Sequence, residues 1–254
     1  MNENKFIIVT PAYKVSKWIE LYVNMLKFQS YKNFEVYFVD DDSPDDTVEK
    51  LKKVIDGDSR FHIHVNEISA KSPLANIVKA TELANPNDED IIVNIDGDDW
   101  LSSVFVLQYL NKIYNQHNCW MTYGTCQLYP SGEIVGHANI DMPDEVSDKN
   151  MYRKFPFIMS HLRTYKAWLY NKIDKRDFID SRTNKIYTEA SDVALIMPMA
   201  EMAGKNKICR IHDILYILNR ENALNEATIN FSGQKESEHI IRTQHKVYDR
   251  LKEY

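Results

Sequence analysis

Short apolar runs alternate with segments of helical period in the N-terminal part of the chain. The runs are rich in Ile, Val and Phe and have the length of buried strands. The segments between them repeat apolar side chains every three or four positions, which is the period of one helix face. This alternation predicts an α/β fold, a mostly parallel sheet covered by helices. The expected strands are "FIIVT" (6–10), "FEVYFV" (34–39), "FHIHV" (61–65) and "DIIVNI" (90–95).

Helices are expected at 18–26, at 74–81 directly behind Pro73, and at 102–115. Proline suits the first turn of a helix because its fixed φ and missing N–H cost nothing there. The third helix follows the last strand so closely that the intervening "DGDDW" (96–100) forms a strand-to-helix loop. In open α/β sheets ligands bind at that edge.

The pattern changes in the second half. The segment "WMTYGTCQLYPSGEIVGHANI" (120–140) reads as two strands joined by a turn at 130–132, so this half is expected to be mixed or antiparallel. Residues 140–150 are polar and without period, which predicts a loop and a candidate lid. Residues 236–254 have roughly helical spacing. This C-terminal helix is expected to pack on its own body, and a homodimer contact is the alternative.

Composition excludes several classes of protein. At 254 residues and 44% hydrophobic content the chain can bury a sizeable core, and a net charge of −6 offers no attraction to nucleic acid. No apolar run approaches the ~18 residues of a transmembrane helix, and the start "MNENKFIIVT" lacks a secretory apolar region. We expect a cytoplasmic protein without a transmembrane segment. Its cysteines form no CxxC pair and are expected to be free thiols.

Three carboxylates crowd the end of the fourth expected strand. In "NIDGDDWL" (94–101), Asp96, Asp98 and Asp99 directly follow the apolar run. Like charges at this spacing repel unless a cation, hydrogen-bond donors or water offset them. A bound metal is one interpretation, and a solvated turn is the other.

A second acidic segment, "VDDDSPDDT" (39–47), follows the second expected strand. The carboxyl ends of parallel strands share one edge of a sheet, so the two acidic loops are expected to face each other across a ligand cleft. Asp45 and Asp46 are well explained as a capped helix start. Asp40 and Asp41 stand earlier in the loop and are less well explained by capping.

The two acidic segments and two further segments occur in an order that is typical of a known family. Together they resemble the nucleotide-binding half of family 2 glycosyltransferases of the GT-A fold, over residues 5–101. The resemblance implies one domain with a Rossmann-like nucleotide-sugar-binding half (1–101), an acceptor-binding half (102–235) and the C-terminal helix (236–254). The matching segments are "VTPAYK" (9–14), "FVDDDSPDDT" (38–47), "PLANIVKA" (73–80) and "NIDGDDW" (94–100).

The resemblance also implies roles for single residues. Asp41 matches an aspartate that contacts the nucleotide base, and Asp98 matches the metal-binding end of the DxD element, with Asp96 or Asp99 in support. In "SPLANIVKA" (72–80) leucine and alanine replace the arginine that the family usually has, so Lys71 is expected to supply the missing charge. The residues implied to bind the nucleotide sugar are Thr10, Pro11, Tyr13, Asp41, Lys71, Asn76, Asp96 and Gly97.

Transfer to an acceptor hydroxyl with inversion needs a base, and "YTEASDVALIMPMAEMAG" (187–204) offers candidates. Asp192 is the expected base. It matches the aspartate of the family's acidic acceptor motif, although Ser191 stands where an acidic residue is common. The alternative is that Asp192 caps the helix that runs to Gly204. Glu189 is the reserve base.

Four further residues are candidates for contacts with the acceptor or the phosphates. His161 and Arg163 lie in "SHLRTYKAW" (160–168), and Arg220 lies in "YILNREN" (216–222). Trp100 has an aromatic face that could stack on a sugar. The alternatives are a hydrogen-bonded core histidine, a strand end and ordinary core packing.

The sequence thus predicts a metal-dependent, inverting glycosyltransferase. Its expected donor is a nucleotide-diphosphate sugar, UDP-linked by preference, its cofactor Mn²⁺ or Mg²⁺, and its acceptor a saccharide or glycoconjugate. A nucleotidyltransferase is a rival, but "TPAYKVSKW" (10–18) lacks the usual Gly-rich loop. A phosphohydrolase would carry its DxD after the first strand, and a non-catalytic nucleotide-sugar-binding module would lack a working base.

Overall fold

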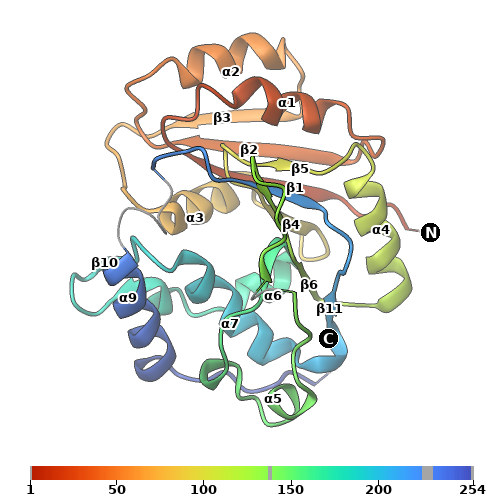
Figure 1. The fold of residues 1–254 in the computed structure, drawn as a ribbon, viewed down its shortest axis with the longest axis vertical. Coiled ribbons are helices and arrows are strands. Elements are labelled where there is room, and N and C mark those ends of the chain that lie inside the picture. The colour runs from red at the N-terminus through yellow and green to blue at the C-terminus, as the bar shows by residue number, and fades with distance from the viewer. Residues whose placement is uncertain (1, 137–138, 225–230, 253–254) are drawn as a thin grey trace.

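The structure is a computed structural model that describes residues 2–136, 139–224 and 231–252. Its centre is a seven-stranded sheet in the order β11-β6-β8-β4-β1-β2-β3 (Figure 1). The four strands expected in the first half are present, and they pair in parallel. They are β1 (Phe6–Ala12), β2 (Phe34–Asp40), β3 (Phe61–Val65) and β4 (Ile91–Asn94).

Helices cover both faces of the parallel strands because alternate residues of each strand belong to different cores. On β1, Phe6 and Ile8 pack into the core beneath α1 and α2. Ile7 and Val9 point the other way, into the core that contains α3. Figure 1 shows α1 and α2 on one side of the sheet and α3 on the other. The helices of this half are α1 (Ile19–Lys27), α2 (Thr47–Ile55), α3 (Pro73–Ala84) and α4 (Val106–His117).

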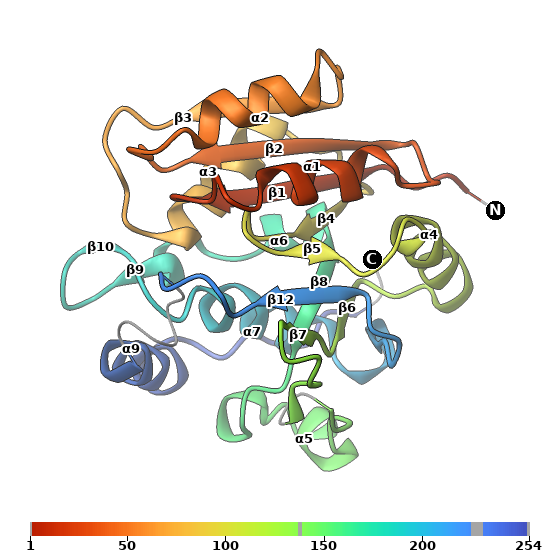
Figure 2. The same cartoon turned by 45° about the horizontal axis from the view of Figure 1, so that its top comes forward.

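The second half makes the sheet mixed, as expected. β8 runs antiparallel between β4 and β6, and β11 pairs in parallel with β6. A separate sheet has the order β5-β12-β7 (Figure 2). The turn at 130–132 closes a hairpin through the bridge between Gln127 and Ile134, but β6 and β7 lie in different sheets. The strands are β5 (Trp100–Leu101), β6 (Met121–Gly124), β7 (Gln127–Tyr129), β8 (Ser160–Lys166), β9 (Ile179–Asp180), β10 (Lys185–Ile186), β11 (Ile208–Arg210) and β12 (Tyr216–Asn219).

Helices of this half pack on the α3 side of the sheet. α7 ends at Ala203, and the φ of +63° at the next residue, Gly204, fits the predicted helix end. The expectation of a loop throughout 140–150 is wrong, because α5 forms there around the buried Val146. Within the described ranges, no helix is long and apolar enough to cross a bilayer. The helices are α5 (Asp144–Asp148), α6 (Ala167–Asn171), α7 (Ser191–Ala203) and α9 (Phe231–Gln244), with short 3₁₀ turns at Tyr152–Lys154, Lys175–Phe178 and Lys205–Lys207.

The C-terminal helix begins and ends earlier than its spacing predicts, since α9 stops at Gln244 and residues 245–252 continue without helical structure. Arg153 contributes to this ending. Its guanidinium donates to the main-chain oxygens of Ile241 (2.6 Å) and Lys246 (2.9 Å), so carbonyls at the helix end bond to a side chain. Ile240 and Ile241 are buried in the chain's own core, which confirms the expected packing on the body.

The ion pair between Arg153 and Glu201 gives a stability prediction. Glu201 is 0% exposed and accepts from the Arg153 guanidinium at 2.5 and 3.0 Å. Glu201→Gln keeps the shape but leaves the buried guanidinium charge unpaired, so we expect a loss of about 3–5 kcal/mol in the free energy of unfolding. Denaturant titration measures it. The control is Glu145→Gln, which breaks an exposed pair with Lys149 and should cost less than about 1 kcal/mol.

Candidate active site

The loops that follow β1, β2 and β4 meet at one edge of the sheet, as the topology predicts. The main-chain N–H of Asp41 donates to Ala12 O (2.8 Å), and that of Gly97 donates to Pro11 O (3.1 Å). A side chain at Gly97 would bring its Cβ within 2.8 Å of the Ala12 Cβ. Glycine is therefore required at this position because the two loops touch there.

Asp41 organises the neighbouring loop 66–71. Its Oδ1 accepts from Asn66 Nδ2 (2.7 Å) and Ala70 N (2.8 Å), and its Oδ2 accepts from Ser69 Oγ (2.8 Å) and Lys71 N (2.9 Å). Burial pushes the pKa of this carboxyl upward, but the hydrogen bonds from Ala70, Ser69, Asn66 and Lys71 outweigh it and lower the pKa. The carboxylate thus fixes the wall of the predicted base pocket.

Two other predicted residues join this wall. Asn76 is buried and accepts from Asn66 Nδ2 at 2.9 Å, which links α3 to the Asp41 loop. Lys71 has an exposed side chain and a left-handed backbone, with φ of +51°. Its side chain is therefore outside the core, and its backbone, bonded to Asp41, lies at the ligand edge of the sheet.

The β1 end presents one of its three predicted residues to solvent. Thr10 is 0% exposed, and its hydroxyl lies 2.5 Å from that of Tyr22 inside the core. Pro11 is also buried. Tyr13 is 39% exposed, with Lys14 Nζ 5.1 Å from its ring centroid. The Tyr13 ring therefore offers the accessible face of this stretch, while Thr10 and Pro11 hold its backbone.

The three crowded carboxylates have different environments. Asp99 is 2% exposed and accepts from Tyr216 Oη and from Asn219 N, each at 2.7 Å. Burial raises the pKa of Asp99 well above its usual range, as do the neighbouring Asp98 and Asp96 charges. Asp99 therefore secures the loop to β12. The sequence interpretation missed these β12 partners, because contacts this distant leave no signal in a local pattern.

Asp98 and Asp96 are half-buried. Asp98 Oδ2 accepts from Asn222 Nδ2 at 2.7 Å, and burial raises the pKa of Asp98. Burial and the Asp98 charge raise the pKa of Asp96 to about 7, and its carboxylate receives no hydrogen bond from the described part of the chain. Among the described residues, no group of three acidic, His or Cys side chains is ready to hold a metal. Two carboxylates suit Mg²⁺ or Mn²⁺ when phosphate and water supply the remaining ligands.

The acceptor half brings Asp192 to the same site. β8 runs antiparallel to β4 and places Arg163 opposite Asn94, at the ligand edge. Arg163 Nη2 donates to Asp192 Oδ2 at 3.0 Å, and Val193 N donates to Asp192 Oδ1 at 2.9 Å. The Arg163 and Asp192 charges both act on Asp96. The N-cap position of α7 is Ala190, so Asp192 lies in the first turn and is not the capping residue.

The remaining candidates differ in accessibility. The His161 ring stacks on Tyr216 with centroids 4.5 Å apart, and burial lowers the pKa of this histidine well below its usual range, with help from Arg163 and Arg220. Trp100 is 9% exposed and packs edge-on against Tyr129. The structure thus gives Trp100 a packing role. Glu189 accepts from Thr188 Oγ1 (2.6 Å), and the Arg220 side chain is exposed beyond β12.

Asp96 makes stability depend on pH. An unfolded aspartate has a pKa of about 3.9, whereas that of folded Asp96 is about 7. The folded state therefore holds the extra proton, and protein treated with a chelator should lose stability as pH rises from about 4 to 7. Asp96→Asn should melt higher than the wild type at pH 8, and this difference should shrink steadily as the pH falls toward 4. Parallel melting curves of the two proteins across this range would contradict the assignment.

Comparison with known sequences decides the family. Residues 7–175 match the family described as Glycosyl transferase family 2. The chain belongs to glycosyl transferase family 2. This membership confirms the predicted family and enzyme class, and it leaves no support for the nucleotidyltransferase alternative. The matched region contains the three loops and Arg163 but ends before Asp192.

Named glycosyltransferases are distant relatives of this chain. Escherichia coli WfgD, "UDP-Glc:alpha-D-GlcNAc-diphosphoundecaprenol beta-1,3-glucosyltransferase", is 25% identical over 185 residues, which cover 66% of this chain and 70% of WfgD. Glycosyltransferase GlyA of Streptococcus pneumoniae serotype 4 is 22% identical over 184 residues, which cover 67% of this chain and 26% of GlyA.

Solved structures confirm the GT-A-like fold. Residues 1–349 of S. aureus TarS, in complex with UDP, match with a TM-score of 0.65 at 17% identity, covering 85% of this chain and 60% of that chain. The mannosyltransferase PcManGT from Pyrobaculum calidifontis, in complex with GDP-Man and Mn²⁺, matches with a TM-score of 0.56 at 16% identity, covering 85% of this chain and 57% of that one. This chain therefore spans less than two thirds of the length of either solved chain.

Proposed function

We propose that this glycosyltransferase moves a sugar from a UDP-sugar to a hydroxyl of a saccharide or glycoconjugate, with inversion and with Mn²⁺ or Mg²⁺. One observation carries the proposal. Asp96 follows the end of β4 in the donor half, and Arg163 of the acceptor half stands opposite Asn94 of that strand and donates to Asp192 Oδ2 at 3.0 Å. A metal-binding pair and a carboxylate base from opposite halves therefore share one site.

The residues divide the reaction between them. Asp98, with Asp96, would hold the metal, which neutralises charge on the departing diphosphate. The wall built on Asp41, with the Tyr13 ring, holds the nucleoside. The acceptor oxygen attacks the anomeric carbon from the face opposite the diphosphate, and the C–O bond to the diphosphate breaks. Asp192 takes the proton of the acceptor hydroxyl, and Arg163 keeps Asp192 turned toward the site.

The relatives support the choice of ligands. WfgD is named for UDP-Glc and for a GlcNAc-diphospholipid acceptor, TarS binds UDP, and PcManGT binds Mn²⁺ together with GDP-Man. A UDP-sugar with Mn²⁺ is therefore the first donor to test. A GlcNAc-diphosphate carrying a short lipid is the first acceptor.

The test is a donor panel of UDP-glucose, UDP-GlcNAc, UDP-galactose and GDP-mannose, each with Mn²⁺ or with a chelator. Free nucleotide and glycosylated product are measured. We expect one UDP-sugar to raise the melting temperature and to give turnover only with metal. A protein that binds the donor with no release of UDP would be a binding module. Turnover unaffected by the chelator would refute the metal role.

A further inference from the structure

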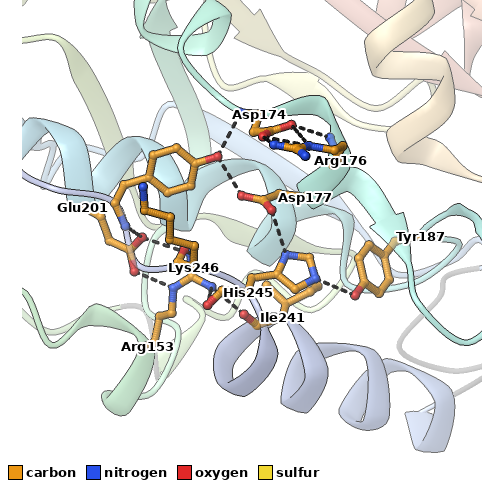
Figure 3. Close-up of polar contacts among 10 residues, drawn as sticks. Arg153, Asp174, Arg176, Asp177, Tyr187, Glu201, Ile241, His245 and Lys246 are labelled. Carbon is orange, nitrogen blue, oxygen red and sulfur yellow. Dashed lines mark hydrogen bonds and ion pairs between the residues drawn. The ribbon is translucent and has the colours of Figure 1, made fainter.

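The residues that follow α9 run back across the body of the protein as a C-terminal strap, residues 245–252. The strap is anchored to the buried ion pair between Arg153 and Glu201 (Figure 3). Arg153 donates to Lys246 O at 2.9 Å, and Tyr248 N donates to Glu201 Oε2 at 3.0 Å. Leu251 N donates to Met202 O at 2.8 Å. These contacts place the strap alongside α7, the helix whose first turn carries Asp192.

His245 connects the strap to a buried tyrosine. Its Nε2 lies 2.9 Å from Tyr187 Oη, and its Nδ1 lies 3.8 Å from Asp177 Oδ1 (Figure 3). Tyr248 Oη donates to Asp177 Oδ2 at 2.6 Å and so holds that carboxylate in place. Burial lowers the pKa of His245, which favours a neutral ring. A proton on Nδ1, facing Asp177, leaves Nε2 to accept the Tyr187 hydroxyl.

Tyr187 opens the segment that leads to Asp192, and its backbone is also held. Its carbonyl oxygen accepts from Ser72 Oγ at 2.6 Å, and its N–H donates to Phe178 O at 3.0 Å. Ser72 is the N-cap residue of α3, so this contact joins the segment to the donor half. Ala190, with φ of +55°, then turns the chain into α7. A short segment fixed at its start in this way has little freedom to move Asp192.

We propose that His245 is a positioning residue for the transfer reaction, which fixes Tyr187 and through it the 187–192 segment that presents Asp192 to the acceptor. The inference rests on the proposed role of Asp192. In the contacts described above, the strap bonds neither to the loops that follow β1, β2 and β4 nor to Arg163. Loss of the His245–Tyr187 contact therefore misplaces the base and leaves donor binding intact, because small displacements of a catalytic group reduce turnover strongly.

The test compares Tyr187→Phe, His245→Ala and the double variant, with UDP-glucose, Mn²⁺ and the GlcNAc-diphosphate lipid. We expect each single variant to lower kcat about tenfold, and the double variant to be no worse than either, because both remove the same contact. KM for UDP-glucose should not change. His245→Gln places an amide near the position of Nε2 and should restore most of kcat. Assays run well below each measured melting temperature.

The matched control is Arg250→Ala, which removes the bond from the strap to Ser147 O without touching Asp177, His245 or Tyr187. A kcat reduced equally in Arg250→Ala would mean that the strap acts only as general support, and it would overturn the inference. If Asp192→Asn is inactive, a Tyr187→Phe variant whose kcat stays within twofold of the wild-type kcat would also overturn the inference. An active Asp192→Asn protein would instead refute the proposed role of Asp192 as the base.

A second measurement does not depend on activity. Amide hydrogen exchange should be faster within 187–192 in Tyr187→Phe than in the wild type and unchanged in loop 66–71. Equal exchange within 187–192 would overturn the inference even if His245→Ala failed to fold.

Discussion

Replacing Asp192 with asparagine should lower kcat by about 10²-fold or more, the scale expected for loss of general-base assistance. The amide keeps the shape of the carboxylate and can still meet Arg163 and Val193, but it cannot take the acceptor proton. Donor and metal affinity should stay close to those of the wild type. Steady-state kinetics with UDP-glucose, together with calorimetry for UDP, measure both quantities.

Asp192→Ala separates catalysis from helix support. If Asp192 served only the first turn of α7, Asp192→Ala would lower the melting temperature and Asp192→Asn would leave stability and rate unchanged. The proposed role predicts two inactive proteins, of which Asp192→Asn is stable. An active Asp192→Asn enzyme would transfer the base assignment to Glu189, and Glu189→Gln would then be the inactive variant.

Asp98→Asn should abolish metal-dependent UDP binding and lower turnover by roughly 10³-fold, because the metal supplies several kcal/mol of charge stabilisation to the leaving diphosphate. A neutral amide cannot offset a divalent charge. The amide can keep its contact with Asn222, so the loop should remain folded. Calorimetry of UDP with and without Mn²⁺ measures the loss directly.

Asp213→Asn is the control for this variant. Asp213 is exposed near β12 and accepts from Tyr109 Oη, outside the site. It should retain wild-type UDP affinity and turnover. If Asp98→Asn bound UDP with the same Mn²⁺ dependence as the wild type, the metal would have to be assigned to other ligands.

The parallel strands and the first-half helices could be predicted from the sequence because their signals are local. Each strand is a buried apolar run between breaks, and each helix shows its period within a dozen residues. The position of the two acidic loops at one edge of the sheet could be predicted from topology, because the carboxyl ends of parallel strands share an edge. Even the helix end at Gly204 follows from the conformation that glycine tolerates.

The environments of the individual carboxylates could not be predicted, because they depend on contacts far away in the sequence. Asp98 and Asp99 look alike in the chain, yet Asn222 leaves Asp98 partly free whereas Tyr216 and Asn219 engage both oxygens of Asp99. The end of α9 was mispredicted for the same reason. The apolar spacing of α9 continues beyond Gln244. The Arg153 guanidinium, however, donates to the main-chain oxygens of Ile241 and Lys246, which further helical turns would use.

The loop that carries Asp96, Asp98 and Asp99 is attached to β12, so it can be completed only after β12 has been synthesised. The four segments that resemble the nucleotide-binding half of the family all lie before residue 102, yet Asp99 meets its donors 117 and 120 positions later. A fragment ending at residue 175, where the family match stops, would bury a carboxylate without these partners, at a cost of at least about 1–3 kcal/mol. The loop that carries Asp96, Asp98 and Asp99 is therefore completed only by residues beyond 175, and we expect the shortest fragment that keeps this loop in place to extend through Asn222.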